Sequence, residues 1–224
     1  MVKIIATIHP SMRRGILKKL VKAGVDIFRI NIKYTPFSVC KRICKDLRKI
    51  GGCEILIDIK KRSVLKKLEG VDYDYLAVSF AEKGSEIVKI RDRISKKVKI
   101  VSKIESKKGV RNVDELIKVS NGIMIARGDL GREINIEKIP FIQKMITKKC
   151  NKRKRFSITA TEMMPSMVSY KRPSRAEVSD VANAILEGSE GLLLAEETAI
   201  GKYPVLVVKT MRKIIREVKS YERR

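Results

Sequence analysis

The sequence predicts an α/β protein built as a single (β/α)8 barrel of the TIM type. Short apolar, β-branched runs alternate with longer amphipathic segments about eight times along the chain. The runs are compact and mainly apolar, as expected of parallel strands that helices cover on both faces. The 224 residues suit one such barrel, and no Pro-rich linker interrupts them. We therefore expect residues 1–224 to form one domain whose sheet closes on itself.

The expected elements follow from these runs, in chain order. Strands are expected at Lys3–Ile8, Val25–Asn31, Glu54–Ile59, Tyr75–Ser79, Lys99–Ile104, Gly122–Ala126, Phe156–Ala160 and Gly191–Ala195. Amphipathic periodicity predicts helices at Arg14–Ala23, Phe37–Ile50, Lys108–Val119, Glu137–Asn151 and Arg175–Glu187. The third helix position, Lys61–Gly70, is short. Ser174 with Glu177 three residues later is a capping-box signature, and Pro204 opens a last helix that runs to about the C-terminus.

The charge of the chain is unusual, and it leaves two interpretations open. Lys and Arg number 51 against 25 Asp and Glu, a net charge of +26. This excess indicates either a surface that binds RNA or the ribosome, or a general drift toward Lys in the proteome. Aromatic residues for base stacking are sparse, at 5%.

The composition also bears on where the protein works. No uncharged apolar run is long enough to span a membrane, and the first residues lack a signal-peptide core. The four cysteines have no Cys-x-x-Cys spacing, which favours reduced thiols over a disulfide or zinc framework. We therefore expect a cytoplasmic protein with no membrane partner.

In a barrel of parallel strands, functional residues lie where the strands end and the βα loops begin. The candidate residues at the predicted strand ends are Arg29, Asn31, Asp58, Lys103, Glu105, Arg127, Gly128, Asp129, Thr161, Glu162, Glu196 and Glu197. Glu105 and Asp129 follow adjacent strands and could share one hard cation such as Mg²⁺. Lys103 could stabilise a developing oxyanion.

The turn after the sixth strand adds backbone donors to this set. Gly128 and Asp129, followed by Gly131, could offer N–H groups to an anionic carboxylate at a helix N-terminus. An ordinary loop turn would explain any one of these features. Together they favour a cation-assisted site for an anionic substrate.

Several stretches of the chain resemble the pyruvate kinase family, in that family's order. They read KIIATIHPS, VDIFRINI, LIDIK, VSKIESKKGVRNVDEL, GIMIARGDLGREI, FSITATEMMPSM and KRPSRAEVSDVANAILEGSEGLLLAEETAIGKYP. The resemblance covers nearly the whole chain, and it is most specific between Lys103 and Pro204. It implies a Mg²⁺- or Mn²⁺-dependent phosphoryl transfer between phosphoenolpyruvate and ADP, with pyruvate as product.

The resemblance also implies roles for individual residues. Glu105 and Asp129 would hold the divalent metal, and Lys103 would stabilise charge on the phosphoryl group and the enolate. The backbone of Gly128 and Asp129, with the Thr161 hydroxyl, would bind the substrate carboxylate. Thr161 also matches the position that delivers a proton.

The phosphoryl and monovalent-cation positions match only in part. Arg29 would bind the phosphoryl group, and Asn31 and Asp58 match two ligands of the monovalent cation. Lys33 stands where the family has a serine, and Ile59 where it has a threonine. Two interpretations of Lys33 stay open: its ammonium replaces K⁺ and lies within about 4 Å of an Asp58 oxygen, or the side chain points to solvent as one more surface charge.

Two larger departures bear on activity. The family inserts a lid domain after the third strand, where this chain has only Ile59–Val71. We also expect the family's C-terminal regulatory domain to be missing. We therefore expect weak turnover, poor binding of ADP or ATP, or a residual metal-dependent enolate chemistry on pyruvate or oxaloacetate. The alternative is a reduced paralogue that binds RNA or the ribosome through its basic surface. A homo-oligomer is compatible with either function.

Overall fold

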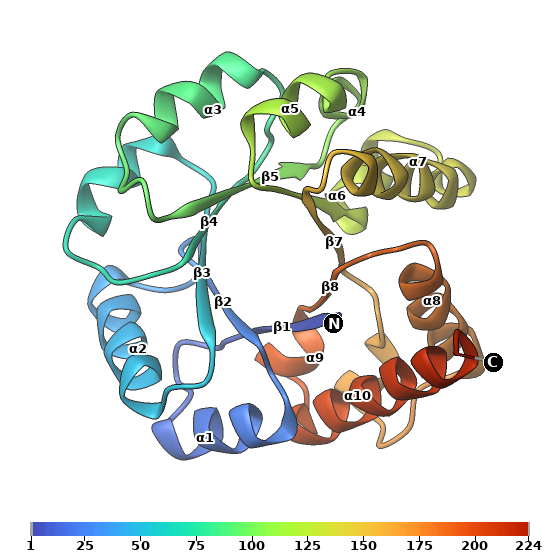
Figure 1. The fold of residues 1–224 in the computed structure, drawn as a ribbon. Helices are drawn as coiled ribbons and strands as arrows, with labels where there is room; N and C mark the ends of the chain where they lie inside the picture. The colour runs from blue at the N-terminus through green and yellow to red at the C-terminus, as the bar shows by residue number, and fades with distance from the viewer. Residues whose placement is uncertain (1, 224) are drawn as a thin grey trace.

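The computed structural model describes residues 2–223 and places eight parallel strands in a closed barrel with helices around it (Figure 1). The strands are β1 (Lys3–Thr7), β2 (Ile27–Asn31), β3 (Glu54–Ile59), β4 (Tyr75–Val78), β5 (Lys99–Ile104), β6 (Gly122–Ala126), β7 (Phe156–Ala160) and β8 (Gly191–Leu194). Each strand pairs with the next in the sequence, and β1 pairs with β8, with Lys3 opposite Gly191. The predicted (β/α)8 barrel is therefore confirmed.

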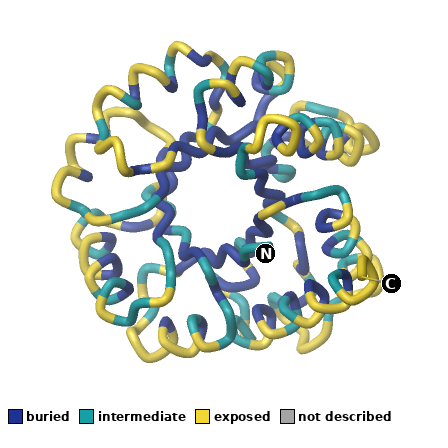
Figure 2. Tube along the Cα trace, viewed as in Figure 1, coloured by how far each residue is buried: buried dark blue, intermediate teal, exposed yellow. Residues whose placement is uncertain are grey.

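Helical segments follow the strands and form an outer ring. The α-helices are α1 (Arg14–Ala23), α2 (Phe37–Ile50), α3 (Gly84–Arg91), α4 (Lys107–Arg111), α5 (Val113–Val119), α6 (Arg127–Glu133), α7 (Ile139–Lys152), α8 (Arg175–Leu186), α9 (Glu196–Ala199) and α10 (Pro204–Tyr221). Three 3-10 helices are η1 (Arg62–Leu68), η2 (Ile136–Lys138) and η3 (Pro165–Val168). The strands are buried, whereas the outward faces of the helices are exposed (Figure 2).

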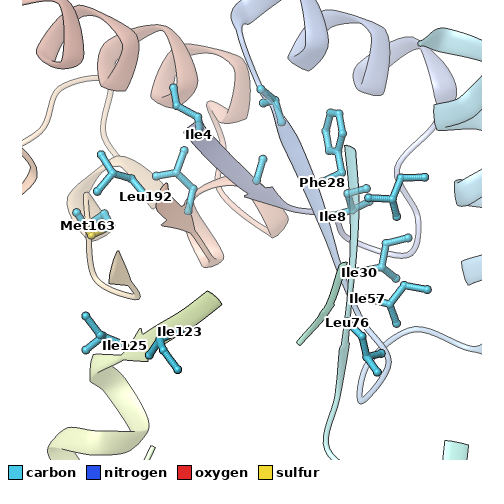
Figure 3. Packing of buried hydrophobic residues seen from close by; sticks show 14 of the residues in the cluster. Ile4, Ile8, Phe28, Ile30, Ile57, Leu76, Ile123, Ile125, Met163 and Leu192 are labelled. Carbon is cyan, nitrogen blue, oxygen red and sulfur yellow. The ribbon is translucent and has the colours of Figure 1, made fainter. Parts of the chain in front are cut away.

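Alternation along the strands produces two separate apolar layers. One set of side chains fills the barrel interior: Ile5, Ile27, Leu56, Tyr75, Ala77, Val101, Met124, Ile158, Ala160 and Leu193. The intervening strand residues, such as Ile4, Phe28 and Ile57, point outward and pack under the helices (Figure 3). A strand turns successive side chains to opposite faces, so a run that is apolar throughout serves both layers.

The last helix links the two ends of the chain. α10 packs beside α1 and α8 (Figure 1). The guanidinium of Arg212 on α10 donates to the carbonyl oxygen of Gly24 at 2.9 and 2.5 Å and pairs with Asp26. Asp26 in turn accepts the N–H of Ile4 on β1 at 2.6 Å. Neither α10 nor any other helix between residues 2 and 223 is apolar over a stretch that could cross a membrane.

Several local predictions differ from the structure. The segment 108–119, predicted as one helix, is divided into α4 and α5 at Asn112, whose side-chain amide donates to the carbonyl of Glu82 at 2.7 Å. The helix predicted from Glu137 begins at Ile139, after η2. Helices α3 and α9 were not predicted, and α6 was expected only as a helix N-terminus at Gly128 and Asp129. The capping box of α8 is confirmed, because Ser174 and Glu177 exchange both hydrogen bonds.

Candidate active site

Three charged residues point into the carboxyl-end mouth of the barrel because of their position along the strands. Arg29, Asp58 and Lys103 each stand two residues after an interior apolar residue of β2, β3 and β5. The period of two along a strand turns them to the same inner face. Their side chains are 12%, 2% and 8% exposed, respectively. The apolar interior therefore ends in a layer of buried charge.

These charges neutralise one another through direct contacts. Arg29 pairs with Asp58, with both Nε and Nη2 at 2.8 Å from Oδ2. The Nζ atom of Lys103 lies 3.0 Å from Oδ2 of Asp58, 2.9 Å from Oε1 of Glu105 and 3.0 Å from the hydroxyl of Ser79. Burial by itself would raise the pKa of Asp58, but Lys103 and Arg29 outweigh it and lower that pKa below its usual value. Lys103 is thus a shared cation between two buried carboxylates.

Glu105, which directly follows β5, is held at both of its oxygens. Oε1 contacts Lys103, and Oε2 accepts the backbone N–H of Phe80 at 2.7 Å. Phe80 has a φ of 50°, which is uncommon for a residue other than glycine. The turn at the end of β4 is therefore shaped to present an N–H group to this carboxylate.

Thr161, at the end of β7, occupies a strained turn against the start of α6. Thr161 has a φ of 73° and Glu162 a φ of 53°, each a conformation that costs about 1–3 kcal/mol for such residues. The Thr161 hydroxyl accepts the N–H of Gly128 at 2.8 Å and donates to the carbonyl oxygen of Ala160 at 2.5 Å. The Gly128 N–H that was predicted to face a substrate carboxylate therefore bonds to Thr161 in this structure.

The two predicted metal ligands lie in different surroundings. Glu105 is buried, whereas the carboxylate of Asp129 on α6 is 46% exposed and contacts Arg132 at 3.4 Å. Between residues 2 and 223, no hydrogen bond or ion pair joins Glu105 to Asp129, and no three His, Cys, Asp or Glu side chains cluster as a metal-binding group. Mg²⁺ often takes only one or two protein carboxylates and completes its shell with water and substrate oxygens. Two hard oxygen donors at neighbouring strand ends fit that preference.

The predicted pairing of Lys33 with Asp58 is wrong. Lys33 lies in the exposed loop after β2, where its ammonium sits 4.8 Å from the centre of the Tyr34 ring. Tyr34 first, and then the carboxylate of Asp129, raise the pKa of Lys33 above its usual value. Asp58 is 2% exposed, and its charged partners are Arg29 and Lys103 instead.

The loop that carries Lys33 is shaped by Asn31, the second residue assigned to the monovalent cation. The side-chain oxygen of Asn31 accepts the N–H of Lys33 at 3.0 Å, a local turn that Asn side chains commonly make. Asn31 thus uses this oxygen to shape the loop.

For several residues of the site, no role was predicted from the sequence. Ser79 bonds to Lys103, Thr7 accepts from Arg29 at 3.0 Å, and Phe80 binds Glu105 through its backbone. Arg127 was recognised only as a polar residue at a strand end, yet its guanidinium binds the turn at Thr161. The alternation along β1 and β4 could have indicated Thr7 and Ser79, whereas no sequence pattern indicates a backbone donor.

Comparison with known proteins shows the family to which the chain belongs. Residues 55–208 match the family model of the pyruvate kinase barrel domain. The chain belongs to the pyruvate kinase family. That match includes Asp58, Lys103, Glu105, Asp129 and Thr161, whereas Arg29 lies before it.

Curated pyruvate kinases resemble the chain over much of its length. Pyruvate kinase of Clostridium perfringens is 44% identical over 201 residues, which cover 88% of this chain and 38% of the relative. Pyruvate kinase of Geobacillus stearothermophilus is 47% identical over 63% of this chain and 25% of the relative. A probable cytosolic isozyme of pyruvate kinase from Arabidopsis thaliana is 47% identical over 66% of this chain and 30% of the relative. The chain therefore spans about a quarter to two fifths of the length of these relatives.

Proposed function

We propose that the barrel catalyses phosphoryl transfer between phosphoenolpyruvate and ADP, the reaction for which its family is named. The observation that carries this proposal is Lys103, a buried ammonium held between Asp58 and Glu105 at the mouth of the barrel. A buried charge cluster is costly to maintain for stability, because charges lose hydration on burial. Such clusters concentrate at functional sites, where they stabilise charge that develops during a reaction.

The residues of the mouth could divide the work of this reaction. In phosphoryl transfer the bond from the enol oxygen to phosphorus breaks as a bond to the nucleotide oxygen forms. The guanidinium of Arg29 would bind the phosphoryl oxygens, while Asp58 holds that guanidinium in place. Lys103 would stabilise the negative charge on the enolate oxygen. The Thr161 hydroxyl would help to deliver a proton to the enolate carbon, which yields pyruvate.

A divalent cation, Mg²⁺ or Mn²⁺, would be held by Glu105 and Asp129. When bound, it would supply Lewis-acid stabilisation of the substrate oxygens. Lys103 already occupies Oε1 of Glu105, so the ammonium and the cation would share this carboxylate. The Gly128 N–H would either break its bond to the Thr161 hydroxyl and donate to the substrate carboxylate, or donate to both.

The short connection between β3 and β4 supports a slow or partial reaction. Only η1 and its flanking loops join these strands, and no lid domain lies between them. Closing a site over the nucleotide excludes water, which such transfers commonly need. The barrel would therefore retain the enolate half of the reaction better than the nucleotide half.

We also infer that residues 1–224 fold as one domain and act in the cytoplasm.

A coupled assay with phosphoenolpyruvate, ADP and Mg²⁺ tests the proposal, and Lys103→Ala is the inactive control. Pyruvate formation that requires ADP and Lys103 is the expected result. Decarboxylation of oxaloacetate without phosphoryl transfer would identify the reduced enolate chemistry instead. If neither reaction depends on Lys103, the proposed function is wrong.

RNA or ribosome binding is a second candidate, and the net charge of +26 is the observation that favours it. Neutralising phosphates releases counterions, so RNA affinity should fall steeply as salt concentration rises. A filter-binding series between about 50 and 200 mM salt measures this slope. No retention of RNA at the lowest salt would reject the candidate.

A further inference from the structure

We propose that Arg127 is a positioning residue that holds the left-handed turn at Thr161 and so keeps the Thr161 hydroxyl against the Gly128 N–H, where the proposed function needs it. This inference rests on the proposed function and deepens it. Arg127 bonds to the carbonyl oxygen of Thr161, and among the described residues it forms no hydrogen bond or ion pair with Lys103 or Glu105.

The guanidinium matches the carbonyl groups that this turn exposes. Nη2 of Arg127 donates to the carbonyl oxygen of Thr161 at 2.7 Å and to that of Glu162 at 3.2 Å. Nε reaches the same Thr161 oxygen at 3.3 Å. A planar fork of five N–H donors can serve two neighbouring carbonyls, which a lysine ammonium on a flexible stem does less well. The Arg127 side chain is 12% exposed, so little water competes for these carbonyls.

Two helices fix the guanidinium from its other edge. Nη1 of Arg127 pairs with Asp180 on α8 at 2.8 Å and donates to Gln143 on α7 at 3.3 Å. Gln143 in turn donates to Glu187 at 2.9 Å. These contacts fix the orientation of the guanidinium, so the positions of α7 and α8 determine where it meets the turn at Thr161.

Two consecutive residues directly after β6 bind the carbonyl and the hydroxyl of Thr161. Arg127 binds the carbonyl, and the next residue, Gly128, donates its N–H to the hydroxyl at 2.8 Å. Thr161 is β-branched and has a φ of 73°, a conformation that such residues avoid unless their surroundings enforce it. Without the Arg127 fork, Thr161 is free to return to negative φ. The hydroxyl would then lose its bond to the Gly128 N–H.

Two readouts test this role, and the first is independent of any ligand. Hydrogen exchange of the Gly128 amide, followed by NMR, reports the bond to the Thr161 hydroxyl. We expect about tenfold faster exchange in Arg127→Lys, which keeps a charge for Asp180 but loses the fork, and more in Arg127→Met. Arg132→Met is the matched control, because Arg132 lies on the same helix and is 83% exposed. Its Gly128 exchange should match that of the native chain.

The second readout is the affinity for oxalate, an enolate mimic, measured calorimetrically with Mg²⁺. We expect Arg127→Lys to weaken oxalate binding about tenfold in the native background and less than about twofold in a Thr161→Ala background. This coupling distinguishes action through Thr161 from a general loss of structure, which would weaken both backgrounds equally.

The outcomes separate this inference from the proposed function. Unchanged Gly128 exchange, or equal losses of oxalate affinity in both backgrounds, would overturn the role of Arg127. If the native chain binds no oxalate but Gly128 exchange rises only in the Arg127 variants, the proposed function fails and the hold of Arg127 on Thr161 stands. Faster exchange with coupled loss of oxalate affinity supports both.

Discussion

The ammonium of Lys103 lies 3.0 Å from the carboxylate of Asp58, although 45 residues and an intervening strand separate them in the barrel. β3 and β5 both flank β4, so two inward side chains at the same height meet across it. Both charges are nearly excluded from water, which strengthens their interaction compared with a surface pair. The stability of the barrel and its proposed chemistry therefore depend on the same pair.

Replacing Lys103 should damage both properties. In Lys103→Met, two buried carboxylates lose their shared cation, which should destabilise the fold by about 3–5 kcal/mol. Pyruvate formation should fall by about 10²–10³-fold, because a preorganised positive charge is removed. Lys99→Met is the matched control, since Lys99 lies on the same strand with 53% of its side chain exposed. Full activity in Lys103→Met would contradict the assignment.

Asp129 should matter for metal-dependent binding but little for stability. Its carboxylate is 46% exposed, and its contact with Arg132 at 3.4 Å is a surface pair worth about 0–1 kcal/mol. In Asp129→Ala we therefore expect a nearly native melting temperature and no Mg²⁺-dependent binding of oxalate by calorimetry. Glu137→Ala, on the exposed η2 segment, should bind oxalate normally. Native oxalate affinity in Asp129→Ala would remove Asp129 from the metal site.

The lowered pKa of Asp58 predicts an acid-dependent loss of stability. A carboxylate whose pKa is lower in the folded state stabilises the fold fully above its unfolded pKa, about 3.9. That contribution disappears as pH falls through the lower folded pKa. The difference in unfolding free energy between the native chain and Asp58→Asn should therefore shrink below about pH 4 in urea titrations. Parallel curves down to about pH 2 would contradict this linkage.

The capping box of α8 should contribute measurably to stability. Glu177 accepts the N–H of Ser174 at 2.6 Å, the N–H of Ser166 at 2.6 Å and the Ser166 hydroxyl at 2.5 Å. Ser174→Ala should destabilise the protein by about 1 kcal/mol, as loss of an N-cap does. Glu177→Ala should cost more, because three donors lose their acceptor. Ser179→Ala, within the same helix, is the control, and a melting temperature equal in all three variants would reject this prediction.

Much of the fold could be predicted because its signals are local. An apolar run serves both faces of a buried strand, and the capping box needs only two residues three positions apart. The helix predicted at 108–119 is broken into α4 and α5 for a non-local reason. Asn112 bonds to the carbonyl of Glu82 from another loop, and no periodicity in its own segment reports that acceptor.

The sequence by itself determined the order of the eight strands, the place of Arg29, Asp58 and Lys103 at the strand ends, and the family. Strand period and motif order are properties of the chain, so they can be read without coordinates. Only the tertiary structure decided that Asp58 pairs with Arg29 and Lys103 rather than Lys33. It also decided the turns at Phe80 and Thr161, whose positive φ accompanies hydrogen bonds to Glu105, just after β5, and to Arg127 on α6. Loop side chains take their direction from such distant hydrogen bonds, and a sequence pattern does not encode which partner will be close enough to form them.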